Sequence, residues 1–179
     1  MTTRHSDSAD QVWTLIEKIK IAMVVSHDSR GEELRTRPMA AHPDRNRRAI
    51  YFLTDAGSGK VAEVAGNREI CLAFADPQAS DYLSLTGLAS LSDDRALIKQ
   101  LWSIAERAFW RDENDPAIRV LRVDPREAEY WRGPGTFKGY FKTFVALLSG
   151  GKPQLRDNEK VLLSSPPSAP DSPRRSSDL

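Results

Sequence analysis

The sequence predicts an α+β fold that is mainly β, in which short antiparallel strands alternate with a few helices. A length of 179 residues suits one domain with a tail, and 40 % hydrophobic residues are enough to form a core. At least five short segments before residue 92 are rich in aromatic and β-branched residues. Most of them are joined by short polar connections, which favours an antiparallel meander or barrel over a parallel sheet.

The expected strands follow one another with turn signals between them. The apolar segment 21–26, the turn at 27–32 and the returning segment 34–41 predict a hairpin. A polar loop is expected at 43–48. Further strands are expected at 49–54, 69–75, 82–91, 118–123 and 128–131, the last two as a strand pair.

Helices are expected before, between and after these strands. Apolar residues at helical spacing predict a first helix that buries one face, formed by Val12, Leu15, Ile16 and Ile19. Ser8 and Gln11 have the pattern of a capping box for this helix. A short helix is expected at 59–65, a longer one at 93–108 with Ser92 as its cap, and an aromatic-rich one at 139–148.

Composition divides the chain into four parts. We expect a flexible N-terminus at 1–10, a folded domain at 11–151, a C-terminal extension at 152–163 and a disordered tail at 164–179. Six Ser and four Pro fill ten of the sixteen tail positions, a composition that cannot build a packed core.

Charge and composition exclude several classes of protein. The net charge of +1 gives no support for binding to nucleic acid or to an anionic membrane. No run of eighteen apolar residues and no apolar N-terminal leader occur, and one Cys cannot form an intrachain disulfide, so a cytoplasmic location is expected. The three His residues have no metal-binding spacing, so no metal site is expected.

The segment 51–60 has the features of an anion site. A strand ends near Thr54, a glycine-containing turn follows, and a helix starts after Ser58, so that free N–H groups and the positive end of the helix dipole face a ligand. Ser58 adds a hydroxyl and Lys60 a charge, while Gly57 and Gly59 permit close backbone approach. The spacing fits neither a nucleotide P-loop nor a nucleophile elbow. An ordinary helix N-cap would have the same residues, so the anion site and the simple cap both stay open as interpretations.

The segment 35–39 supplies two arginines to one face of a strand. Arg35 and Arg37 alternate along the strand and are suited to bidentate contact with a phosphate. Pro38 removes a backbone donor, which indicates an edge or a bulge. Two solvated arginines on an exposed face would explain the pattern equally well.

These segments, in this order, resemble a known family. RTRPM at 35–39, YFLTDAGSGK at 51–60, DYLSLTGLASL at 81–91 and AEYW at 128–131 are similar to the FMN-binding split barrels of the pyridoxamine 5′-phosphate oxidase-like superfamily. The general stress protein branch is the nearer match, and the resemblance covers residues 11–162. It implies a six-stranded antiparallel split β-barrel with Greek-key topology, flanked by helices. It also implies a homodimer with two FMN sites at the subunit interface.

The resemblance assigns cofactor contacts to individual positions. Arg37, with Pro38 and Met39, falls on the strand that lines the FMN, and Arg35 falls where a second anion ligand would stand. Thr54 falls where a strand end meets the flavin or its ribityl chain, and Ser58, Gly59 and Lys60 form the phosphate-binding turn. Tyr82 falls where the oxidases carry a flavin-contacting Gln, and Trp131 where an aromatic residue of the partner subunit approaches the ring.

Some positions depart from the family's oxidases. Gly59 and Tyr82 stand where those enzymes have Arg and Gln, Leu53 replaces an aromatic residue, and their basic C-terminal substrate segment is absent. We therefore expect an FMN-dependent oxidoreductase of unknown substrate, with no assigned acid–base residue because the flavin carries the redox chemistry. A flavin-binding stress or sensor protein without turnover is the alternative. A true pyridoxamine 5′-phosphate oxidase, and a different flavin, a deazaflavin or a haem as the ligand, also stay open.

Overall fold

The computed structural model describes residues 3–103, 105–132 and 158–163, with a predominantly β architecture. The helices are α1 (Thr3–Ile19), α2 (Gly59–Gly66) and α3 (Arg95–Leu101), and a single 3₁₀ turn follows at Ala105–Ala108. The strands are β1 (Ile21–His27), β2 (Leu34–Ala40), β3 (His42–Asp44), β4 (Ala49–Asp55), β5 (Glu69–Asp76), β6 (Asp81–Ser92), β7 (Ile118–Trp131) and β8 (Asn158–Leu162).

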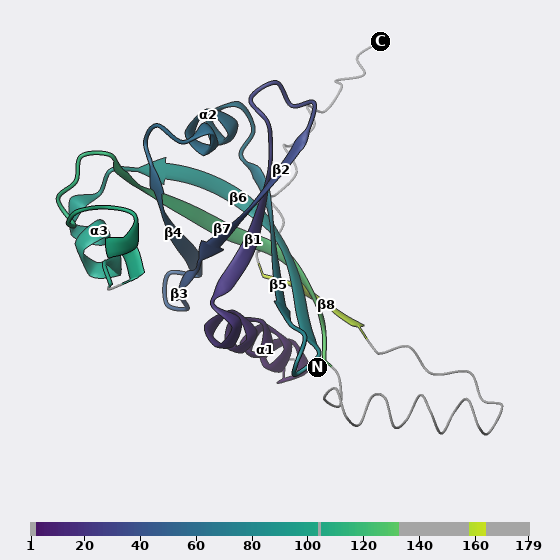
Figure 1. The fold of residues 1–179 in the computed structure, drawn as a ribbon. Coiled ribbons are helices and arrows are strands. Elements are labelled where there is room, and N and C mark those ends of the chain that lie inside the picture. Colours follow the sequence, from purple (N-terminus) through teal and green to yellow (C-terminus); the bar gives the residue numbers. More distant parts are fainter. Residues whose placement is uncertain (1–2, 104, 133–157, 164–179) are drawn as a thin grey trace, which may run out of the picture.

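All eight strands belong to one antiparallel sheet that curls into a half-barrel (Figure 1). The order along the sheet is β2-β1-β5-β6-β7-β4-β3, and β8 pairs with β7 beside this path. This arrangement confirms the α+β, mainly β class. The three-residue β3 and the five-residue β8 are additions to the six longer strands, and β3 occupies part of the segment expected to be a polar loop.

The segment 118–131 forms one continuous strand, so the expectation of a strand pair was wrong. Strand β7 pairs with β6 from Val120 to Trp131, and the register shifts once, between Thr86 and Gly87, where Arg126 of β7 is the extra residue next to Pro125. A bulge of this kind absorbs the proline without ending the strand. Because Pro125 interrupts the apolar pattern, the sequence predicted two strands, whereas the chain continues as one strand with a bulge.

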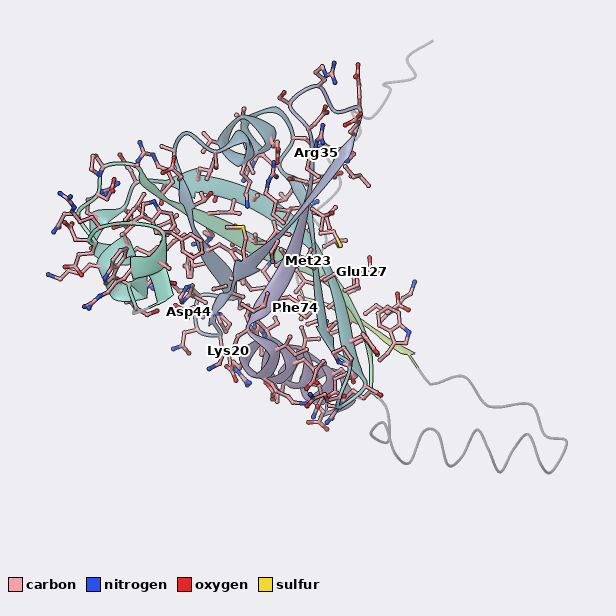
Figure 2. All side chains as sticks on the ribbon, viewed as in Figure 1. Lys20, Met23, Arg35, Asp44, Phe74 and Glu127 are labelled. Atoms are coloured by element: carbon pink, nitrogen blue, oxygen red, sulfur yellow. The ribbon has the colours of Figure 1, made fainter. Side chains whose placement is uncertain are left out.

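Two groups of buried side chains hold the half-barrel together. The larger lies between α1 and the concave face of the sheet and includes Ile16, Phe52 and Phe74, which are at most 2 % exposed. The smaller lies under α3, around Ile98 and Ile118. Phe74 and Met23, both labelled in Figure 2, come from neighbouring strands, yet Met23 is 41 % exposed because side chains alternate between the two faces of a sheet.

Two expected caps are wrong. Helix α1 begins at Thr3, so Ser8 lies inside it and cannot cap its start. Ser92 is the last residue of β6, and Asp94 caps α3 by accepting a hydrogen bond from the Leu97 N–H at 3.0 Å. Helix α3 ends at Leu101, and the 3₁₀ turn follows, so the expected helix at 93–108 is two short pieces.

The expected helix at 139–148 and the tail at 164–179 lie outside the described residues, and the domain boundaries stay predictions. Within the described part of the chain, no helix is both long and apolar enough to cross a lipid bilayer.

Candidate functional site

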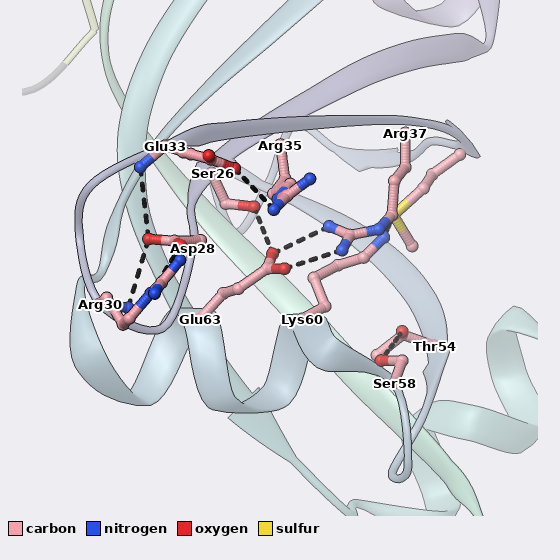
Figure 3. A network of polar contacts seen from close by, with 11 residues as sticks. Ser26, Asp28, Arg30, Glu33, Arg35, Arg37, Thr54, Ser58, Lys60 and Glu63 are labelled. Carbon is pink, nitrogen blue, oxygen red and sulfur yellow. Dashed lines mark hydrogen bonds and ion pairs between the residues drawn. The ribbon is translucent and has the colours of Figure 1, made fainter.

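A cluster of polar side chains, called the pocket below, lies where β4 passes into α2, opposite the edge strand β2 (Figure 3). Strand β4 ends at Asp55, whose side chain accepts a hydrogen bond from the Gly57 N–H at 2.7 Å and so fixes the turn. Ser58 is the N-cap residue of α2, as expected, but its hydroxyl makes no capping hydrogen bond. It lies 3.1 Å from the hydroxyl of Thr54 instead, so that two hydroxyl groups stand side by side at the start of the helix.

Lys60 is a buried cation at the first turn of α2. Its side chain reaches under β2, the residue is 4 % exposed, and its Nζ lies 2.7 Å from the sulfur of Met39. Among the described residues, no oxygen atom accepts a hydrogen bond from this ammonium group. Burial, and to a smaller extent the positive charge of Arg37, lower the pKa of Lys60 from 10.5 to about 8, while Glu63 opposes the change. A thioether is a weak acceptor, so the ammonium group is left short of hydrogen-bond partners.

Arg37 reaches the same pocket from β2 and is held by Glu63 of α2. Its Nη1 and Nη2 donate to the two carboxylate oxygens at 2.8 and 2.7 Å, and Ser26 donates to the same carboxylate at 2.6 Å. The hydrogen bonds from Arg37 are the main cause that lowers the pKa of Glu63, and the same pair raises the pKa of Arg37. The carboxylate is therefore ionised at neutral pH, and the two charges form a bidentate ion pair.

The start of α2 and the Arg37 side chain of β2 approach each other closely at Gly59. A β-carbon added to Gly59 would lie 3.6 Å from Nη2 of Arg37 and 3.4 Å from Oε1 of Glu63. Arg37 therefore lies within contact distance of the turn that carries Ser58 and Lys60. Gly59 itself is exposed, so the backbone at the start of α2 is accessible to solvent at this position.

The structure thus gathers six of the ten candidate residues in one place: Arg37, Met39, Thr54, Ser58, Gly59 and Lys60. Pro38 lies between two of these on β2, opposite Met23 of β1. Arg35 lies beside this cluster, opposite Ser26 of β1 (Figure 3), but its guanidinium pairs with Glu33 at 2.6 Å and its side chain is half exposed.

Tyr82 and Trp131 lie away from this pocket, at the end of the sheet where β6 begins and β7 ends. They face each other as a cross-strand pair. They line an apolar groove of about 610 Å³ that also includes Ile21 and Met23 of β1 and Ala73 of β5. Ile21 and Met23, two residues apart on β1, are 50 % and 41 % exposed, which is high for large apolar side chains on one face of a strand.

Sequence patterns did not identify Glu63 as part of the site. One signal was available, since Glu63 follows Lys60 by three residues on a helix, which places both side chains on one face. Its partner on β2 is 26 residues away in the chain, and no local pattern connects them.

The pocket can hold a small oxyanion. The buried ammonium group of Lys60, the paired hydroxyls of Thr54 and Ser58, and the N–H groups at the start of α2 all suit phosphate oxygens. Arg37 retains N–H groups that Glu63 does not use, because a guanidinium carries five. The chemistry of these residues fits a phosphate monoester.

Comparison with known proteins identifies the family of the chain. The family model described as pyridoxamine 5′-phosphate oxidase like matches residues 7–154, which is most of the chain. A curated relative, the protein bli-3 of Neurospora crassa, is 27 % identical over 121 residues. That match covers 62 % of this chain and 58 % of the relative, so the chain spans less than two thirds of bli-3.

Solved structures share the fold. A protein of Jannaschia sp. CCS1 assigned to general stress protein 26 gives a TM-score of 0.70 at 22 % identity and covers 88 % of this chain and 99 % of its own. The general stress FMN/FAD binding protein of Xanthomonas citri gives 0.64 at 22 % identity, with 73 % and 92 % covered. General stress protein 26 of Bacillus anthracis gives 0.60 at 20 % identity, with 68 % and 91 % covered.

Proposed function

The chain belongs to the pyridoxamine 5′-phosphate oxidase-like family, and on this premise we propose that it binds flavin mononucleotide through the pocket at the start of α2. A structural neighbour from Xanthomonas citri is named for FMN/FAD binding, which supports a flavin as the cofactor class. The phosphate group distinguishes FMN from riboflavin, and the pocket supplies the chemistry that a phosphate group needs.

One observation carries the proposal: Lys60 is an ammonium group at 4 % exposure whose only hydrogen bond in the described structure goes to a sulfur atom. A buried charge without an oxygen partner is costly, and proteins rarely keep one unless a ligand completes it. A dianionic phosphate at the first turn of α2 would supply the missing acceptors and neutralise the charge.

Each residue of the pocket would make a different contact with the phosphate group. Lys60 and the N–H groups at the start of α2 would bind phosphate oxygens, and the hydroxyls of Thr54 and Ser58 would donate further hydrogen bonds. Arg37, fixed by Glu63, would add a charge from the opposite strand. The bound flavin would supply electron or hydride transfer, while the chain would bind and orient it.

We further propose that the protein is an oxidoreductase that acts as a homodimer in the cytoplasm. The apolar groove lined by Met23, Tyr82 and Trp131 supports the dimer, because partly exposed large apolar side chains favour burial against a second surface. The single Cys, Cys71, is free, in keeping with a reducing compartment.

The cofactor is tested by the visible absorption spectrum of the purified protein and the mass of the molecule that co-purifies with it. We expect flavin absorbance, the mass of FMN, and loss of both in Lys60→Glu. Lys99→Glu is the matched control, because Lys99 is 73 % exposed on α3 and takes no part in the pocket. A colourless protein that also fails to bind added FMN would refute the proposal.

Turnover is tested separately on the loaded protein. An oxidoreductase should consume NADH or NADPH, or another electron donor, under aerobic conditions. Absence of consumption with every donor would favour the alternative, a flavin-binding stress or sensor protein without turnover.

A further inference from the structure

Glu63 is a buried carboxylate that lies beside the two cations of the pocket, Arg37 and Lys60. It lies one turn after Lys60 on α2, is 5 % exposed, and accepts hydrogen bonds from both Arg37 and Ser26. All three contacts favour the ionised carboxylate. The pocket therefore contains a permanent negative charge that comes from the chain itself.

This charge changes the electrostatic balance of the site. Arg37 and Lys60 carry two positive charges, and Glu63 cancels one of them. The carboxylate is also close to the helix start, since a β-carbon on Gly59 would lie 3.4 Å from Oε1. A phosphate dianion that binds beside Gly59 would thus experience repulsion from Glu63 and find two N–H groups of Arg37 already engaged.

We propose that Glu63 competes with the phosphate group for Arg37 and thereby keeps the affinity of the pocket for its flavin low enough for reversible exchange. The inference rests on the proposed function, because it concerns the same pocket. It adds that the charge of Glu63, and not only the ligands of the phosphate, sets the affinity. Ser26 takes part by holding the carboxylate beside the guanidinium.

The substitution Glu63→Gln tests this directly. The amide has nearly the same shape, can still accept a hydrogen bond from Arg37, and removes the negative charge. We expect the dissociation constant for FMN to fall roughly tenfold, because one repulsive charge a few ångströms from the phosphate is removed. The dissociation constant for riboflavin, which lacks the phosphate, should change less than about twofold.

Glu33→Gln is the matched control. Glu33 also pairs with an arginine on the same hairpin, Arg35, but its side chain is 57 % exposed and lies outside the pocket. This variant removes the same charge from the protein, so it separates the local effect from the change in net charge. We expect its affinities for FMN and riboflavin to match those of the wild-type protein.

Ser26→Ala keeps the inference testable if Glu63→Gln does not fold, which thermal unfolding without ligand would reveal. Ser26 donates at 2.6 Å to the carboxylate, so its loss weakens the hold on Glu63 and should tighten FMN binding about two- to threefold. Fluorescence quenching of the free flavin measures all these constants without any turnover.

The outcomes separate the two proposals. If the wild-type protein binds FMN but Glu63→Gln or Ser26→Ala binds it no better or more weakly, Glu63 positions Arg37 and does not compete, and this inference is overturned while the flavin proposal survives. Tighter binding of FMN and riboflavin alike would also overturn it. If no variant binds either flavin, both proposals fail.

Discussion

The ammonium nitrogen of Lys60 lies 2.7 Å from the sulfur of Met39, and within the described residues this is its only hydrogen bond. Lys60 projects from α2 and Met39 from β2, so the contact spans the gap between the helix and the edge strand. A charged group in this position opposes folding in the absence of a ligand and favours binding in its presence.

Lys60→Met should stabilise the ligand-free protein and weaken its binding of FMN. Methionine fills a similar volume without a charge to desolvate, so the free energy of unfolding at pH 7 should rise by roughly 1–2 kcal/mol. Urea unfolding monitored by tryptophan fluorescence measures the change. Lys99→Met, at an exposed position, should change the stability by less than about 0.5 kcal/mol. A destabilised Lys60→Met protein would mean that the ammonium group has stabilising contacts that the structure does not show.

Affinity for FMN should decrease above pH 8. The pKa of Lys60 is lowered from 10.5 to about 8, so the side chain is charged below this pH and increasingly neutral above it. Phosphate is dianionic above about pH 6. The dissociation constant should therefore be nearly constant from pH 6.5 to 7.5 and then rise up to about tenfold per pH unit above 8.

The same pKa predicts the opposite trend for folding. Between pH 8 and 10.5 the unfolded chain retains the Lys60 proton that the folded chain has lost, so stability should rise with pH in this window. Lys60→Met should lack both trends, and riboflavin should show no comparable loss of affinity. Equal pH dependence for FMN and riboflavin would assign the effect to another group.

Met23→Asp should convert the proposed dimer into a monomer. Met23 is 41 % exposed on the groove that Tyr82 and Trp131 line, and a carboxylate there would have to be desolvated on association. Light scattering coupled to size exclusion should give 20.0 kDa for the variant and twice this mass for the wild-type protein. Leu34→Asp is the control, because Leu34 is 65 % exposed but lies outside the groove. A monomeric wild-type protein would remove the dimer from the proposal.

Gly87→Ala should destabilise the fold at the bulge between β6 and β7. A β-carbon there would lie 2.5 Å from the backbone oxygen of Asp124, and backbone atoms cannot move aside cheaply. We expect a loss of about 2–3 kcal/mol. Gly66→Ala at the end of α2 is the matched control, since its nearest new contact is 3.6 Å and alanine favours the helix. Equal stability of the two variants in urea would contradict the expected clash.

Local patterns predicted most of the fold and the centre of the site. Two parts of the fold could be predicted locally: the β1–β2 hairpin, and the strand, glycine-containing turn and short helix at 49–66. In both, the apolar alternation, the turn residues and the capping residues favour the same structure. The convergence of Arg37 with Lys60 came from the family resemblance, and the contact at Gly59 now supplies its geometry.

Features that depend on distant partners were not predicted. Glu63 acquires its role only because β2 curls over α2, and Pro125 is accommodated within β7 by a bulge at the next residue, opposite Thr86 and Gly87 of β6. The break after Leu101 in the expected long helix likewise has no clear local stop signal. In each case tertiary contacts outweigh what the neighbouring residues favour.

The ion pair between Arg37 and Glu63 has a mechanical consequence. Strand β2 ends the sheet and has a single strand neighbour, β1, whereas α2 bridges β4 and β5, which are not adjacent in the sheet. A phosphate group shared by β2 and α2 would act as a clasp across the open side of the half-barrel. Binding of the phosphate group would then slow amide hydrogen exchange throughout the β1–β2 hairpin. Without it, local opening would begin where β2 contacts α2.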